Sequence, residues 1–166
     1  MKRSLPRLAL YFLAGGATAA IAAENRVDVS KIIDKATAET ILEESVKAPA
    51  PRNVEGTDGY YSKCNYYSTN ARKRLVIRVY QAAPGYDAHK ELEAVAENAG
   101  AMRAISGLGE KARISSGVQG GLPQQVVMLY VVKGTALITV GIGGFDDENI
   151  SADKLKTVAQ KIVAQL

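Results

Sequence analysis

The only cysteine of the chain, Cys64, lies between two tyrosine pairs in the segment GYYSKCNYYS, residues 59–68. A thiol acts as a nucleophile or redox centre when a nearby base or helix N-terminus lowers its pKa. The sequence offers no CxxC pair, and its one histidine, His89, falls within a predicted helix. These features favour a buried thiol that packs as a small apolar side chain. An intermolecular disulfide and a reactive thiol remain as alternatives.

The chain carries no pattern typical of a metal or cofactor site. Zinc sites combine several Cys and His ligands, whereas this sequence has one residue of each type. The acidic segment FDDEN, 145–149, lacks the alternating spacing of a calcium loop. The glycine pairs in GLGEKA, 107–112, and GIGGFDD, 141–147, complete neither a P-loop nor a dinucleotide-binding motif. We therefore predict no metal and no cofactor, and we expect these glycines in turns with positive φ.

Tyrosines and cations form the remaining candidate site. A hairpin centred on Ala71-Arg72 would pair Cys64 with Val79, and alternation then places Cys64 on the core face of the sheet. Five side chains on the opposite face are candidate ligand-binding residues: Tyr61, Lys63, Tyr67, Arg78 and Tyr80. Tyrosine offers apolar area and a hydroxyl at low entropy cost, which suits a sugar, an anionic lipid or a peptide. The alternative is that the rings only cover the sheet or pack under a helix.

Residues 1–23 have the layout of a secretory signal peptide. A basic head, MKRSLPR, precedes an apolar run that ends in the small-x-small pattern Ala20-Ile21-Ala22. The run is shorter than the roughly 20 residues that span a bilayer. We therefore expect cleavage near Ala22 or Ala23 and no stable membrane span afterwards; the alternative is an uncleaved membrane anchor. The mature chain, 24–166, is predicted to be one domain that is periplasmic or secreted.

The basic charge of the chain belongs largely to this leader. The sequence has 21 basic and 17 acidic side chains, and Lys2, Arg3 and Arg7 all lie in the leader. The densest later cluster, ARKR at 71–74, is too short for a nucleic-acid-binding surface. We therefore expect no nucleic-acid partner.

The hydrophobic pattern predicts an α+β fold. Helices are expected at 37–46, 87–100 and 151–166, with N-caps at Asp34 or Thr37, Asp87 and Ser151. Strands are expected at 60–69, 74–82, within 107–116, at 124–132 and at 135–143, and a loop at 47–59. Short hairpin connections require antiparallel pairing. We expect about five strands with three helices packed on one face, in the order α-β-β-α-β-β-β-α.

These segments resemble a family of small exported proteins, the lipoproteins of unknown function common in actinobacteria and the extracellular sensor domains of their receptor kinases. The resemblance covers most of residues 34–166. It rests on TAETILEESV, CNYYS followed by a strand, ISGLGEKARI, the strands around VVKGTALITV and the closing amphipathic helix. Glu43 stands where the family has a glycine at a helix end. The family's second cysteine and its lipobox are absent.

The resemblance implies an envelope binding or sensing module with no catalytic residues to carry over. We expect a non-catalytic module that binds a small molecule, a glycan or an envelope protein through the tyrosine-bearing face and neighbouring loops. Two alternatives are a thiol- or carboxylate-dependent envelope hydrolase and a structural or assembly protein of the envelope. The lone histidine and the absence of a nucleophile motif favour the binding module over the hydrolase.

Overall fold

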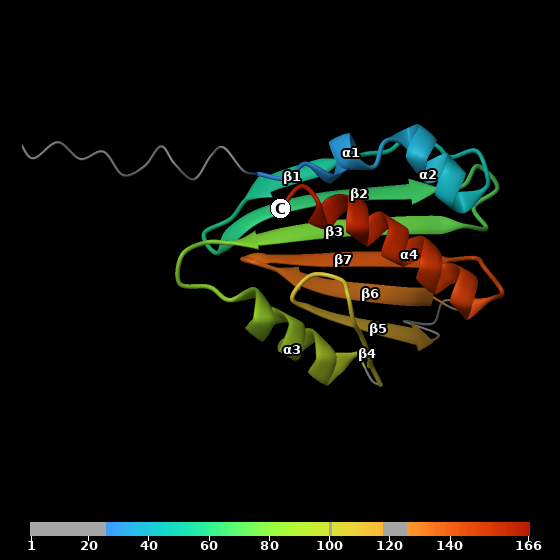
Figure 1. Ribbon diagram of the computed structural model, residues 1–166. Coiled ribbons are helices and arrows are strands. Elements are labelled where there is room, and N and C mark those ends of the chain that lie inside the picture. The colour runs from blue at the N-terminus through green and yellow to red at the C-terminus, as the bar shows by residue number, and fades with distance from the viewer. Residues whose placement is uncertain (1–25, 100, 118–125) are drawn as a thin grey trace, which may run out of the picture.

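Seven antiparallel strands form one sheet in the computed structural model, which describes residues 26–99, 101–117 and 126–166 (Figure 1). The strand order is β1-β2-β3-β7-β6-β5-β4. The strands are β1 (Arg52–Glu55), β2 (Gly59–Tyr67), β3 (Arg74–Ala82), β4 (Arg103–Ile105), β5 (Lys111–Gly117), β6 (Val126–Lys133) and β7 (Ala136–Gly143). The helices are α1 (Val29–Ile32), α2 (Lys35–Leu42), α3 (Ala88–Asn98) and α4 (Glu148–Val163). The predicted signal peptide and its cleavage site lie outside the described residues.

The α+β class and the antiparallel pairing are confirmed, but the predicted number of strands is wrong. The two additional strands, β1 and β4, form the two edges of the sheet. All four residues of β1 are exposed, so this strand carries no apolar alternation that would reveal it. It begins directly after Pro51, inside the segment predicted as a loop, and an edge strand tolerates a neighbouring proline. Strand β4 has only three residues.

Helices cover both faces of the sheet, so the expectation of three helices on one face is wrong. Helices α1, α2 and α4 pack on one face, which we call the core face, and α3 packs on the other, which we call the α3 face. In Figure 1, α4 crosses in front of the central strands and α3 lies beside the lower ones. Neighbouring side chains of β6 serve the two layers: Leu129 packs in the core with Leu155, whereas Tyr130 packs in the cluster of Leu92. This explains why β6 reads as a nearly continuous apolar run.

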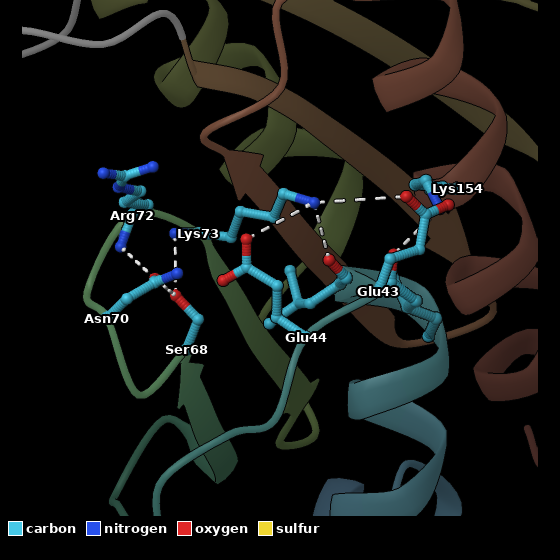
Figure 2. Close-up of polar contacts among 9 residues, drawn as sticks. Glu43, Glu44, Ser68, Asn70, Arg72, Lys73 and Lys154 are labelled. Carbon is cyan, nitrogen blue, oxygen red and sulfur yellow. Dashed lines mark hydrogen bonds and ion pairs between the residues drawn. The ribbon is translucent and has the colours of Figure 1, made fainter.

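The β2–β3 hairpin has a different register from the predicted one. Cys64 lies opposite Ile77, not Val79, because the loop of residues 68–73 is centred between Asn70 and Ala71, one residue earlier than predicted. In that loop Ala71 has a φ of 59°. Asn70 accepts a hydrogen bond from the backbone N–H of Arg72 (Figure 2). A shift of two residues leaves every side chain on its predicted face, because side chains alternate with a period of two.

Aspartates cap the three longer helices. Of the two predicted N-caps of α2, Asp34 is confirmed and Thr37 is not, and the predicted N-cap Asp87 of α3 is confirmed. For α4 the cap is Asp147, and the expectation of Ser151 is wrong. Asp147 accepts hydrogen bonds from two backbone N–H groups, while the Ser151 hydroxyl donates to the Asp147 carbonyl. The predicted end of the second helix, Gly100, lies outside the described residues.

Two lysines hold the C-terminal end of α2, and we call Lys73 and Lys154 the lysine cluster (Figure 2). Lys73 Nζ donates to the Leu42 carbonyl at 3.0 Å, and Lys154 Nζ donates to the Ile41 carbonyl at 2.9 Å. Such carbonyls have no partner within a helix, and cations suit this end of the helix dipole. Both ammonium groups also lie over the ring of Phe145, at 4.4 and 5.1 Å from its centroid.

Glu43 follows directly as the C-cap of α2, with a left-handed φ of 57°. Side chains other than glycine rarely adopt this conformation. This is the position where the resembled family has glycine. Lys154 Nζ lies 2.7 Å from the Glu43 carboxylate. That hydrogen bond lowers the pKa of Glu43, so the carboxylate stays ionised and paired.

Candidate functional site

The α3 face holds a pocket of about 390 Å³ over strands β1, β2, β3 and β7. Strand pairing arranges its outward side chains in two parallel rows. One row, which we call the apolar row, consists of Val54, Tyr61, Tyr80 and Leu137. The other, which we call the basic row, consists of Arg52, Lys63 and Arg78 and ends at Thr139 of β7. Helix α3 packs on β3, β6 and β7 and buries Tyr80 and Leu137, while Val54 and Tyr61 of β1 and β2 stay exposed.

A stacked tyrosine pair forms the centre of the apolar row. The rings of Tyr61 and Tyr80 lie 4.7 Å apart between centroids at an angle of 26°. Both hydroxyls donate to Asp58: Tyr61 to its carboxylate and Tyr80 to its backbone carbonyl, the latter at 2.8 Å. Partial burial and the hydrogen bond to Asp58 raise the pKa of Tyr61. The Tyr61 hydroxyl therefore stays protonated at neutral pH. Its hydrogen bond to Asp58 holds the ring in place, and the ring forms an apolar wall of the pocket.

The two tyrosines differ in burial. Tyr61 is 40% exposed, whereas Tyr80 is only 8% exposed because it packs with Leu92 of α3. The expectation that Tyr80 stands on an open face is therefore wrong. Its ring belongs both to the pocket wall and to the smaller hydrophobic cluster under α3.

The basic row lacks the carboxylate partners that other cations of this face have. Among the described residues, Arg52, Lys63 and Arg78 make no ion pair or hydrogen bond through their side chains. On the same face, strand β5 also carries two cations, Lys111 and Arg113. Both contact Glu93 of α3, at 2.5 and 3.1 Å. Like charges placed directly opposite each other destabilise a sheet, so the basic row is a feature that folding alone does not require.

Four of the five candidate residues from the sequence line this pocket: Tyr61, Lys63, Arg78 and Tyr80. The fifth, Tyr67, lies on the same face at the other end of β2 and is not part of the lining. Its hydroxyl accepts a hydrogen bond from Asn65 at 3.2 Å.

Sequence reasoning missed the residues that β1 and β7 contribute. Arg52 lies directly opposite Lys63 because β1 pairs with β2, and β1 was taken as a loop. Thr139 lies opposite Arg78 because β7, distant in sequence, pairs with β3. A usable signal for β7 was present, since Thr139 is a polar residue inside the apolar segment ALITVG.

The thiol of Cys64 lies on the core face and is fully buried. Burial raises the pKa of the Cys64 thiol, which keeps it in the unreactive protonated form. The histidine that a thiol hydrolase would need, His89, lies on α3 across the sheet, with Nε2 3.4 Å from Glu110. This separation does not support the thiol-dependent form of the hydrolase that the sequence left open.

Within 26–99, 101–117 and 126–166, no three His, Cys, Asp or Glu side chains are grouped so that they could hold a metal ion. No helix in this part of the chain is long and apolar enough to cross a membrane. A second pocket, of about 330 Å³, lies between the β4–β5 turn and α4. Its two cations face carboxylates: Arg103 lies 3.9 Å from Glu148 and Lys156 lies 3.0 Å from Asp153.

Comparison with known proteins identifies the fold. No protein-family model and no curated protein matches the sequence. Among solved structures, the chain is similar to the extracellular domain of PknH from Mycobacterium tuberculosis, with a TM-score of 0.50 and 14% sequence identity. The match covers 82% of this chain and 93% of that domain. At this identity the likeness is one of fold. It agrees with the predicted resemblance to receptor-kinase sensor domains at that level.

Proposed function

We propose that this protein is an exported, non-catalytic binding module, similar in role to a sensor domain, which takes a small molecule into the pocket on the α3 face. The observation that carries the proposal is the basic row. Three cations without carboxylate partners, beside a stacked tyrosine pair, make a surface that suits an anionic ligand. The signal-peptide pattern of residues 1–23 and the fold shared with an extracellular domain support export.

The size and rigidity of the pocket favour a small molecule over a protein partner. A volume of about 390 Å³ lies within the range of roughly 300–1,000 Å³ that is usual for small-ligand sites. Its walls are side chains of four paired strands, and sites on such elements hold their geometry better than sites on loops. Cys64 is buried on the core face, and the pocket lies on the α3 face. This supports a role without covalent chemistry by the thiol.

Two tyrosines of β2 provide a matched test of the pocket. Tyr61 and Tyr67 lie on one strand and one face, with 40% and 45% exposure, but only Tyr61 lines the pocket. A library of small metabolites is screened by amide chemical shifts in NMR spectra. We expect bound compounds to shift amides of β1, β2 and β3. Tyr61→Ala should weaken their binding by about tenfold or more, and Tyr67→Ala by less than about twofold.

Tyr80→Ala is a poor probe of binding, because the loss of its buried ring would also weaken the packing under α3. Equal effects of Tyr61→Ala and Tyr67→Ala would contradict the placement of the site. Chemical turnover of a bound compound by the wild-type protein would contradict the non-catalytic role.

A further inference from the structure

The basic row concentrates charge on three neighbouring strands. Lys63 lies directly opposite Arg52 on one side and Arg78 on the other. Directly opposed residues have Cα atoms about 5 Å apart, so the three side chains start within roughly 10 Å of each other. Arg52 and Arg78 are exposed and Lys63 is half-buried. The three charges can therefore converge on one anion without movement of the sheet.

The pocket has opposite electrostatic character at its two ends. Besides partial burial, the carboxylates of Asp58 and Glu91 raise the pKa of both Tyr61 and Tyr80. Asp58 lies at the tyrosine side of the pocket, because it accepts the hydrogen bonds of both tyrosine hydroxyls. Its carboxylate disfavours an anion over the tyrosines, and the cations of the basic row attract one. A ligand is thus oriented with its negative group over the basic row.

The apolar row provides the surface for the rest of such a ligand. Tyr80 and Leu137 are largely buried, at 8% and 7% exposed, and form the floor of this row, so its accessible surface comes from Val54 and Tyr61, each 40% exposed. These side chains offer contact area to an acyl chain or a flat ring but few polar partners. The basic row and the apolar row are adjacent along every strand, two residues apart. A single molecule that lies across both rows must therefore be amphipathic.

The donors of the basic row suit a phosphate group. Two guanidinium groups with five N–H donors each and one ammonium with three can satisfy all the oxygens of a phosphate. Three positive charges exceed what a single carboxylate balances, whereas a phosphate monoester carries a charge of about −2 at neutral pH. We infer that the pocket binds an anionic amphiphile in which a phosphate monoester lies on the basic row and an apolar chain or ring lies on the apolar row. This inference rests on the binding function proposed above.

Isothermal titration calorimetry with matched alkyl probes tests the inference. Decyl phosphate, decanoate, decyl glucoside and inorganic phosphate are titrated below their micelle concentrations. We expect decyl phosphate to bind at least about tenfold more tightly than the other three, because only it satisfies both rows. Its affinity should fall as salt rises, since part of the attraction is electrostatic.

Variants that remove one positive charge test whether the phosphate group lies on the basic row. Arg78→Gln should weaken decyl phosphate binding by about tenfold or more and leave decyl glucoside unchanged. Arg72→Gln is the matched control: it removes the same charge from the exposed β2–β3 loop, outside the pocket, and should change neither affinity by more than about twofold.

The outcomes separate this inference from the proposed function. If decyl glucoside or decanoate binds as tightly as decyl phosphate, and Tyr61→Ala but not Arg78→Gln weakens binding, the pocket remains a binding site and the phosphate assignment is overturned. If inorganic phosphate binds as tightly as decyl phosphate, the apolar row does not contribute to binding and the inference that the ligand is an amphiphile is overturned. If no probe binds and no library compound shifts pocket amides, both the inference and the proposed function fail.

Discussion

The lysine cluster and the basic row use the same kind of residue in opposite ways. In the lysine cluster, Lys73 and Lys154 each contact a helix carbonyl and a carboxylate (Figure 2). Both also lie over the ring of Phe145. In the basic row, the three cations contact no carboxylate of the described chain. The charges of the lysine cluster are paired within the fold, whereas those of the basic row are left available for the ligand proposed above.

Burial explains the difference. The side chains of Lys73 and Lys154 are only 18% and 17% exposed, so their charges require partners within the protein. Those partners join α2, the β2–β3 loop and α4, which lie far apart in the sequence. Arg52 and Arg78 are exposed, so water solvates their charges and no partner is needed for folding. Cations that hold the fold together can therefore be told apart from solvated surface cations by their partners and exposure, although not by residue type.

The largest expected effect concerns stability at the lysine cluster. Lys154→Met removes the hydrogen bond to the Ile41 carbonyl and should lower the free energy of unfolding by about 2 kcal/mol, the usual contribution of a charged hydrogen bond. Urea denaturation measures this change. The control is Lys156→Met on the same helix, which loses only an exposed pair with Asp153 and should cost less than about 0.5 kcal/mol. Equal losses in the two variants would remove the contrast between the lysine cluster and ordinary surface charges.

Acid should weaken the lysine cluster and leave the basic row unaffected. The hydrogen bond from Lys154 lowers the pKa of Glu43 in the folded state, so the unfolded state binds a proton more readily. The stabilisation is therefore present above about pH 4.5, the ordinary pKa of the carboxyl, and is lost as pH falls through the lower folded value. Thermal unfolding measured across this pH range should show the acid-dependent loss of stability in Arg78→Gln. The loss should be smaller in Glu43→Gln, which has no carboxyl to protonate at this position. A pH profile that Glu43→Gln does not change would contradict this.

The smallest expected effect is a gain in stability from the basic row. Arg78→Gln removes a charge directly opposite Lys63 and should raise the free energy of unfolding by about 0.5 kcal/mol at low salt. Urea denaturation at low and high salt checks this, because salt should abolish the gain. A clear loss of stability instead would mean that Arg78 has a structural role like that of Lys154.

Local signals in the sequence were sufficient for several features of the fold. Asp34 and Asp87 precede apolar helical patterns, and each caps its helix. Alternation placed Cys64 and Tyr66 on the core face, because a strand has a period of two whatever its partner. The same alternation placed Tyr61, Lys63 and their neighbours on the other face before any pairing was known.

Contacts between distant segments decided the rest. The sequence by itself determined the class of the fold, the faces of β2 and β3 and most of the candidate side chains. Only the tertiary structure placed Arg52 beside Lys63, Thr139 beside Arg78 and α3 on the second face. An edge strand such as β1 has no apolar pattern of its own, and its register depends on a partner strand. The basic row exists only after three strands have paired, because none of its cations neighbours another along the chain.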